Sequence, residues 1–189
     1  MNKGDSRPND EWTRIGVSPS ADQTARASSL PPCKDFDIRI ARDGTWYYRG
    51  SPIQRKELVR LFSTVLRRED DGSYWLVTPA ERGRVTVEDA PYTAVELAVQ
   101  GEGPRQVLRF RTNVDHWVEA GPAHPLRVVA DPDSGAPRPY ILVRDRLEAL
   151  IVRSVYYHLA ELAVERRHEG ANMLGVWSKE TFFPLGRAA

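Results

Sequence analysis

The sequence contains little cysteine and no long apolar run. Cys33 is the single cysteine, so the chain cannot form an internal disulfide. No apolar run reaches the roughly 20 residues that span a bilayer, and the polar start MNKGDSRPNDEW lacks the apolar stretch of a signal peptide. We therefore expect a cytoplasmic protein without a membrane partner.

The sequence also has almost no net charge. Its 27 lysine and arginine residues face 26 acidic residues, so it lacks the overall positive field that non-specific nucleic-acid binding requires. With 41% hydrophobic residues in a chain of 189, the protein can form one ordinary domain or two small ones. We expect no nucleic-acid partner.

Residues 1–31 are rich in serine and proline and poor in apolar groups. Such a stretch buries too little surface to offset the entropy of ordering. We therefore expect a disordered tail, in which Trp12, Ile15 and Val17 could dock as a short segment.

We expect the order strand, turn, strand, helix, strand over residues 36–79. The alternation in FDIRI followed by Asp43-Gly44 predicts a hairpin. In SPIQ, Ser51 as N-cap and Pro52 at the first helical position predict a helix start with a capping box. Apolar residues spaced by three and four extend this helix to near residue 70, and SYWLVTP forms the next strand.

The hairpin allows two registers. A two-residue turn would place Ile40 opposite Tyr47, whereas a three-residue loop with Gly44 left-handed would place Ile40 opposite Trp46. The second register gathers more apolar area on one face and is favoured. In both registers an aromatic ring and an arginine share a face, which suits either a stacked, charged ligand or a contact between domains.

The rest of the chain predicts a meander over 83–119, strands in LRVVAD and YILV, a long helix over 145–167 and a closing strand in GVWSKETFFPL. Asp145 and Glu148 stand in capping-box positions of the long helix. The order of elements at 36–79 recurs at 126–185, which predicts a gene duplication. We therefore predict an α+β fold of two related domains, 32–80 and 81–189, each a strand set with one main helix.

No catalytic constellation emerges from the motifs. The four histidines lack the close spacing of zinc ligands, and Ser51 and Ser154 lack the glycine-flanked elbow of a hydrolase. Gly101-Glu102-Gly103 is too short for a phosphate loop. We therefore expect no cofactor and favour a protein without enzymatic activity.

The strand VLRFRTNVDHW places polar side chains on one face, because alternate residues of a strand point the same way. Arg109, Arg111, Asn113 and Asp115 share that face. They could bind a phosphate and a sugar or base, or they could form a solvated strand face.

Three strings carry a family resemblance: FDIRIARDGTWYYRGSPIQRKELVRLFSTVLRRE, YWLVTPAERGRVTVEDAPY and FRTNVDHWVEAGPAHPLRV. In order and spacing, residues 33–186 resemble a bacterial family of uncharacterised proteins, domain-of-unknown-function family 1285. The resemblance implies a duplicated core whose C-terminal domain is a pleckstrin-homology-like antiparallel barrel or sandwich with a long helix. It also implies a role in signal transduction and a ligand pocket at the domain interface. The residues implied at this pocket are Trp46, Tyr48, Arg49, Trp75, Thr78, Pro79, Glu81, Arg111, Asn113 and Asp115.

We therefore expect a non-enzymatic protein that binds a small anionic, nucleotide-like ligand between its two halves. One alternative is a protein-interaction module or homodimeric adaptor. Another is a phosphoesterase that uses Glu81, Asp115 and a metal ion.

Overall fold

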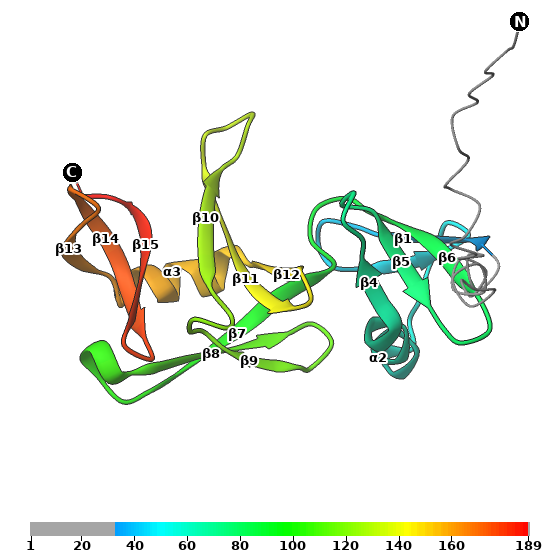
Figure 1. Ribbon diagram of the computed structural model, residues 1–189, viewed down its shortest axis with the longest axis horizontal. Coiled ribbons are helices and arrows are strands. Elements are labelled where there is room, and N and C mark those ends of the chain that lie inside the picture. The colour runs from blue at the N-terminus through cyan, green and yellow to red at the C-terminus, as the bar shows by residue number, and fades with distance from the viewer. Residues whose placement is uncertain (1–32, 189) are drawn as a thin grey trace, which may run out of the picture. The chain divides into compact units, whose positions relative to one another are not determined.

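The computed structural model describes residues 33–188. Within this range the chain is mostly β, with two α-helices and one short 3-10 helix, and the strands form two six-stranded sheets and one three-stranded sheet (Figure 1). The expected tail, with Trp12, Ile15 and Val17, lies outside the described residues. The elements are β1 (Cys33–Ile40), β2 (Trp46–Tyr48), β3 (Ser51–Pro52), α2 (Lys56–Val65), β4 (Leu66–Arg68), β5 (Tyr74–Val77), β6 (Arg82–Val87), β7 (Tyr92–Gln100), η1 (Gly103–Arg105), β8 (Val107–Thr112), β9 (Trp117–Glu119), β10 (Leu126–Ala130), β11 (Pro137–Arg144), β12 (Leu147–Ile151), α3 (Arg153–Glu161), β13 (Val164–His168), β14 (Ala171–Ser178) and β15 (Thr181–Arg187).

The first sheet has the strand order β3-β2-β1-β6-β5-β4, in which β1 and β6 are parallel and the other pairs antiparallel. Ile40 pairs with Trp46 across the hairpin, and the N–H of Ala41 donates to the carbonyl of Thr45 at 2.9 Å. Gly44, with φ 83°, ends the three-residue loop in the left-handed region that glycine tolerates. The favoured register of the hairpin is confirmed.

Helix α2 begins later than the sequence predicted. Ser51 and Pro52 pair with β2 as strand β3, and the N–H of Ile53 donates to the carbonyl of Trp46 at 2.8 Å. Because the backbone groups of these residues belong to the sheet, the helix starts only at Lys56, with Arg55 as N-cap. It ends at Val65, since Leu66 already pairs with Leu76 in strand β4. The helix start at Ser51 and the helix end near residue 70 were therefore wrong.

The second sheet has the order β10-β11-β12-β7-β8-β9, again with one parallel pair at its centre, β12 with β7. Asp145 and Arg146 both have positive φ, 42° and 66°, and form a two-residue hairpin turn between β11 and β12. This turn type matches the twist of the flanking strands. Of the two residues expected to cap a long helix, Asp145 therefore lies in a turn and Glu148 in strand β12.

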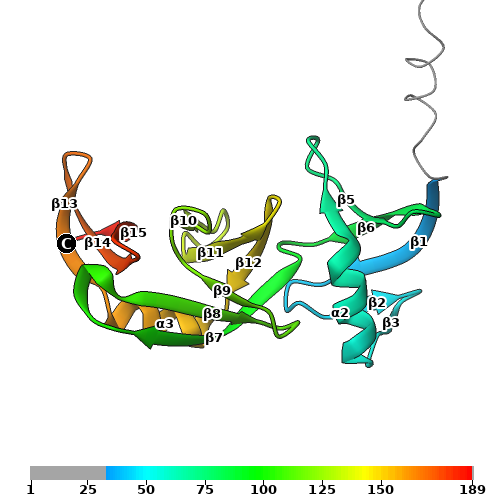
Figure 2. The same cartoon turned by 60° about the horizontal axis from the view of Figure 1, so that its bottom comes forward.

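The predicted helix over 145–167 is divided among three elements. Leu147, Ala149 and Ile151 are buried and alternate with more exposed neighbours in β12, so the apolar residues follow a period of two. Helix α3 covers only Arg153–Glu161, and the next five-residue element is strand β13. Figure 2 shows α3 beside β7, which it contacts.

The C-terminal segment forms the third sheet, β13-β14-β15. The sequence predicted one closing strand in GVWSKETFFPL, but Lys179 and Glu180 have positive φ, 48° and 59°, and form a turn between β14 and β15. Ser178 pairs with Thr181 across this turn. The segment therefore supplies two antiparallel strands.

One cluster of buried side chains draws on strands of both six-stranded sheets. Trp46 and Leu66 of the first sheet and Phe110 and Leu147 of the second are at most 1% exposed and belong to this cluster. Strand β6 lies in the first sheet, although the predicted division at residue 80 placed it with the second domain. We propose a division near residue 90, after the last strand of the first sheet.

Candidate ligand-binding groove

Helix α2 and one face of the first sheet enclose a groove of about 690 Å³. The sheet contributes Phe36 and Ile38 from β1 and Leu76 from β5. Leu58, Phe62 and Val65 of α2 face them, because residues spaced by three and four share one side of a helix. The groove is therefore apolar on its helix wall and on its sheet wall.

Gly83 of β6 makes room for one wall of the groove. A β-carbon at this position would lie 2.1 Å from the Phe36 ring, far inside van der Waals contact. The ring can lie across β6 only because residue 83 has no side chain.

Polar groups stand at the two ends of the lining. Ser51 lies in β3, Gln54 and Arg55 lie between β3 and the start of α2, and Thr78 and Glu81 lie in the loop between β5 and β6. The hydroxyl of Thr78 donates to the carbonyl of Glu81 at 2.9 Å, and the Glu81 carboxylate pairs with Lys34 at 2.5 Å. The polar groups at the β5–β6 end therefore already have hydrogen-bond or ion-pair partners within the protein.

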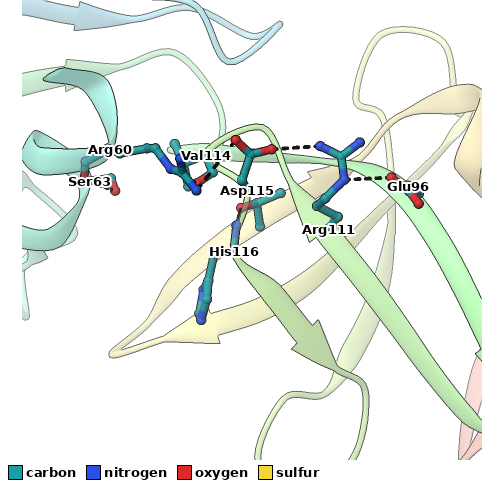
Figure 3. A network of polar contacts seen from close by, with 8 residues as sticks. Arg60, Ser63, Glu96, Arg111, Val114, Asp115 and His116 are labelled. Atoms are coloured by element: carbon teal, nitrogen blue, oxygen red, sulfur yellow. Dashed lines mark hydrogen bonds and ion pairs between the residues drawn. The ribbon is translucent and has the colours of Figure 1, made fainter. Parts of the chain in front are cut away.

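A second feature is a chain of charged groups between α2 and the second sheet, shown in Figure 3. Arg60 of α2 donates through Nε to the carbonyl of Val114 at 3.1 Å, and its Nη2 lies 3.7 Å from Asp115. Asp115 accepts from Nη1 of Arg111 at 2.8 Å, and Nε of Arg111 donates to Glu96 at 2.6 Å. The hydrogen bonds with Glu96 and then Asp115 raise the pKa of Arg111 above its usual value. Two carboxylates therefore already neutralise this guanidinium.

Asn113 joins the hairpin of the first sheet to the second sheet. Its amide Nδ2 donates to the carbonyl of Gly44 at 3.0 Å, and its Oδ1 accepts from the N–H of Thr93 at 3.2 Å. A side chain at residue 44 would approach Asn113 Nδ2 to 2.6 Å. Gly44 is thus required both by its backbone conformation and by this contact.

Of the ten residues implied at the pocket, Pro79 lies in the loop between β5 and β6, and the structure distributes the other nine over separate places. Tyr48, Thr78 and Glu81 line the groove. Trp46, Asn113 and Asp115 line a smaller cavity of about 230 Å³ beside the Gly44 loop.

The remaining three site residues lie elsewhere. Arg49 stacks on the Tyr48 ring at 5.2 Å. Trp75 lies under the guanidinium of Arg82 at 4.0 Å and lines another cavity, outside the groove lining. Arg111 lies in the chain of charged groups described above. The predicted residues therefore do not gather in a single crevice.

Trp46 is a core residue in this arrangement. Its side chain is 1% exposed, and its ring stacks on Phe62 with centroids 6.4 Å apart. Burial of this kind stabilises the fold and leaves little ring surface for a ligand. The aromatic residue of β2 that lines the open groove is instead Tyr48, which is 46% exposed.

Sequence reasoning missed most of the groove lining. The apolar spacing at Leu58, Phe62 and Val65 marked one side of a helix, but such spacing is the same for a covered face and for an open one. Phe36 and Ile38 gave the alternation of a half-buried strand, which again does not show what covers it. Arg55 carried no signal, because the helix was expected to begin at Ser51.

Over residues 33–188, the fold is mostly β with two α-helices, and its apolar groove is of the size that small ligands occupy. Two family models match the chain: "Domain of unknown function (DUF1285), N-terminal domain" over residues 29–90 and "Protein of unknown function (DUF1285), C-terminal domain" over residues 91–185. The chain belongs to the DUF1285 family, as the resemblance in the sequence implied.

Two solved structures are similar to this chain. A DUF1285 family protein from Silicibacter pomeroyi DSS-3 is 46% identical, with 84% of each chain covered and a TM-score of 0.77. A DUF1285 family protein from Shewanella baltica OS155 is 26% identical, with 66% of this chain and 90% of that chain covered and a TM-score of 0.51. A search of curated proteins found no match.

Two further structural observations concern membrane-spanning helices and metal-binding groups. Among residues 33–188, no helix has the length and apolar character needed to cross a membrane. In the same part of the chain, no three histidine, cysteine or acidic side chains are grouped so that they could hold a metal ion.

Proposed function

We propose that this protein binds a small ligand in the groove between α2 and the first sheet, and that the ligand's buried part is apolar. The observation that supports this is the groove itself, about 690 Å³ in volume and lined on both walls by aliphatic and aromatic side chains. Ligand sites in proteins are mostly apolar hollows of roughly 300–1,000 Å³ with a few polar groups that fix orientation. The groove has this composition.

The expected nucleotide-like ligand is a second candidate, at a different place. Arg111 already has two carboxylate partners, so a phosphate would have to displace one of them. A cavity of about 600 Å³ on the first sheet is lined by Trp75 and Arg84, and no carboxylate pairs with Arg84 within residues 33–188. The Trp75 ring and the unpaired cation of Arg84 favour a stacked anion in this cavity, whereas Asp35 and Asp37, which also line it, oppose one.

The groove is tested with a neutral apolar fluorophore, N-phenyl-1-naphthylamine, and the full chain. We expect saturable binding and a rise in melting temperature. Leu58→Gln places an amide in the apolar wall and should weaken binding about tenfold. Leu61→Gln is the matched control, because Leu61 lies on the same helix, is 60% exposed and does not line the groove.

Two outcomes would contradict the groove as the site. Equal binding by the Leu58→Gln and Leu61→Gln proteins would place the fluorophore elsewhere. A melting-temperature shift with nucleotides that Arg84→Ala abolishes and Leu58→Gln leaves intact would favour the second cavity.

An internal repeat is also proposed, but between other residues than the sequence predicted. Numbered from its own first strand, each six-stranded sheet has the order 3-2-1-6-5-4, with strands 1 and 6 parallel. We propose that the repeat joins residues 33–87 with 92–151. The correspondence of 36–79 with 126–185 does not hold element by element, because residues 143–152 form a turn and strand where residues 50–59 lead into α2. Likeness to pleckstrin-homology folds stays a prediction.

A further inference from the structure

The two ends of the groove differ in charge. At the β5–β6 end, Glu81 is neutralised by Lys34 at 2.5 Å. At the other end, Arg55 lines the groove, and within residues 33–188 no carboxylate lies within ion-pair distance of its guanidinium. The groove therefore has an apolar body with an unneutralised cation at one end.

The neighbours of Arg55 also favour negative charge. Gln54 and Ser51, which line the same end, carry an amide and a hydroxyl that can donate hydrogen bonds. Arg55 is the N-cap of α2, and its guanidinium has only donors, so it cannot pair with the free N–H groups of the first turn. The first turn of α2 adds the positive end of the helix dipole, which Glu57 in the same turn partly offsets.

We propose that the ligand is a single-chain aliphatic carboxylate, with its chain in the groove and its carboxylate at Arg55. This inference rests on the groove being the ligand site. A hydrocarbon chain needs no hydrogen-bond partners, which suits the walls built from Phe36, Leu58, Phe62 and Leu76. The planar guanidinium of an arginine binds a carboxylate through two parallel hydrogen bonds, which suits the end at Arg55.

The orientation follows from the same charges. At the β5–β6 end, Lys34 is already paired with Glu81, so a ligand carboxylate there would have to displace Glu81 from it. A carboxylate at the Arg55 end meets a cation without a competing partner. The chain therefore runs from Arg55 toward Thr78, between α2 and the sheet.

The test uses the full chain with the neutral fluorophore already bound and three competitors of equal chain length: dodecanoate, dodecanol and dodecylamine. Dodecanoate should displace the fluorophore at about a tenfold lower concentration than dodecanol, which corresponds to one charge-assisted hydrogen bond. Dodecylamine should compete more weakly than dodecanol. The advantage of dodecanoate should shrink as salt is added, because Arg55 is exposed and exposed charges are screened.

Arg55→Gln should remove the advantage of dodecanoate and leave competition by dodecanol unchanged. Arg55→Lys keeps the charge and should retain part of the advantage. Arg105→Gln is the control, because Arg105 is exposed, lies outside the groove lining and should not change either competitor. Unchanged fluorophore affinity shows that each variant is folded.

The outcomes separate this inference from the groove proposal. The carboxylate assignment is overturned if dodecanoate and dodecanol compete equally in the unmodified protein, or if Arg55→Gln leaves the advantage of dodecanoate intact. In either case the proposal that the groove is the ligand site is unaffected. If the fluorophore itself does not bind, both proposals fail.

Discussion

At the scale of single residues, Asp89 is a mostly buried charged group between β6 and β7. Its side chain is 9% exposed and pairs with Arg138, and it accepts a hydrogen bond from the hydroxyl of Tyr140 at 2.8 Å. Burial, together with this hydrogen bond, raises the pKa of Tyr140 to about 12 from its usual 10.0. Asp89 directly precedes Ala90 and Pro91, which lead into β7, so this cluster fixes the start of the second sheet.

The raised pKa makes stability depend on pH in the alkaline range. Above pH 10 the unfolded chain loses the Tyr140 proton while the folded chain keeps it, so the free energy of unfolding should fall as pH rises from about 10 to about 12. Below pH 10, the Tyr140 hydroxyl makes its full contribution to the free energy of unfolding. The loss should be on the order of 1–2 kcal/mol. Urea unfolding of the unmodified protein and of Tyr140→Phe, at pH 8 and at several values above 10, measures it.

The comparison of the two proteins isolates Tyr140, because the other tyrosines contribute equally to both. The difference between their free energies of unfolding should narrow with rising pH. A difference that stays constant to pH 12 would contradict the assignment.

At the scale of elements, α2 is the part that meets both the groove and the second sheet. One side of it carries Leu58 and Phe62, which line the groove. Arg60 reaches Val114 and Asp115 of the second sheet. At its end, the carbonyl of Ser63 accepts from Nη2 of Arg144 at 2.5 Å and from the hydroxyl of Tyr92 at 3.2 Å.

Arg144 should therefore stabilise the attachment of α2. A cation at the C-terminal end of a helix satisfies its free carbonyls and interacts favourably with its dipole. Arg144→Met should lower the free energy of unfolding by about 1–3 kcal/mol, because it leaves the Ser63 carbonyl short of a charged donor. Arg153→Met, at an exposed position of α3, is the control and should cost less than about 0.5 kcal/mol. Equal losses in urea unfolding would show that the contact contributes nothing.

The elements also show what local sequence rules can decide. The hairpin register at Gly44 was predictable, because turn chemistry and the pattern of Ile38 and Ile40 agree. The start of α2 was not predictable. SPIQ fits a helix N-terminus locally, but in the structure its backbone groups hydrogen-bond to β2. The strand at 147–151 was not predictable, because LEALI fits a helix and an alternating strand equally well, and pairing with β11 and β7 selects the strand.

At the scale of the whole molecule, the buried cluster crosses from one six-stranded sheet to the other. Asn113 adds a hydrogen-bonded bridge to the Gly44 loop. Because neither sheet has a core of its own that is separate from the other, residues 33–188 should unfold together.

We expect a single transition in urea, with the same midpoint by far-ultraviolet circular dichroism and by tryptophan fluorescence. Trp46 reports on the first sheet and Trp177 on the third. Asn113→Ala should move the one midpoint to lower urea without splitting it. Two separated transitions, or midpoints that differ between the probes, would show that the parts on either side of residue 90 fold independently.

The sequence by itself determined the family, most of the strand positions and the turn at Gly44, because these depend on neighbouring residues and on short patterns. Tertiary structure decided that residues 145–151 are not helical, that Trp46 is a core residue and that Arg111 is held by Glu96 and Asp115. It also decided that the apolar side of α2 borders an open groove. These outcomes depend on which distant strand or side chain occupies the neighbouring space, and a local pattern carries no information about that.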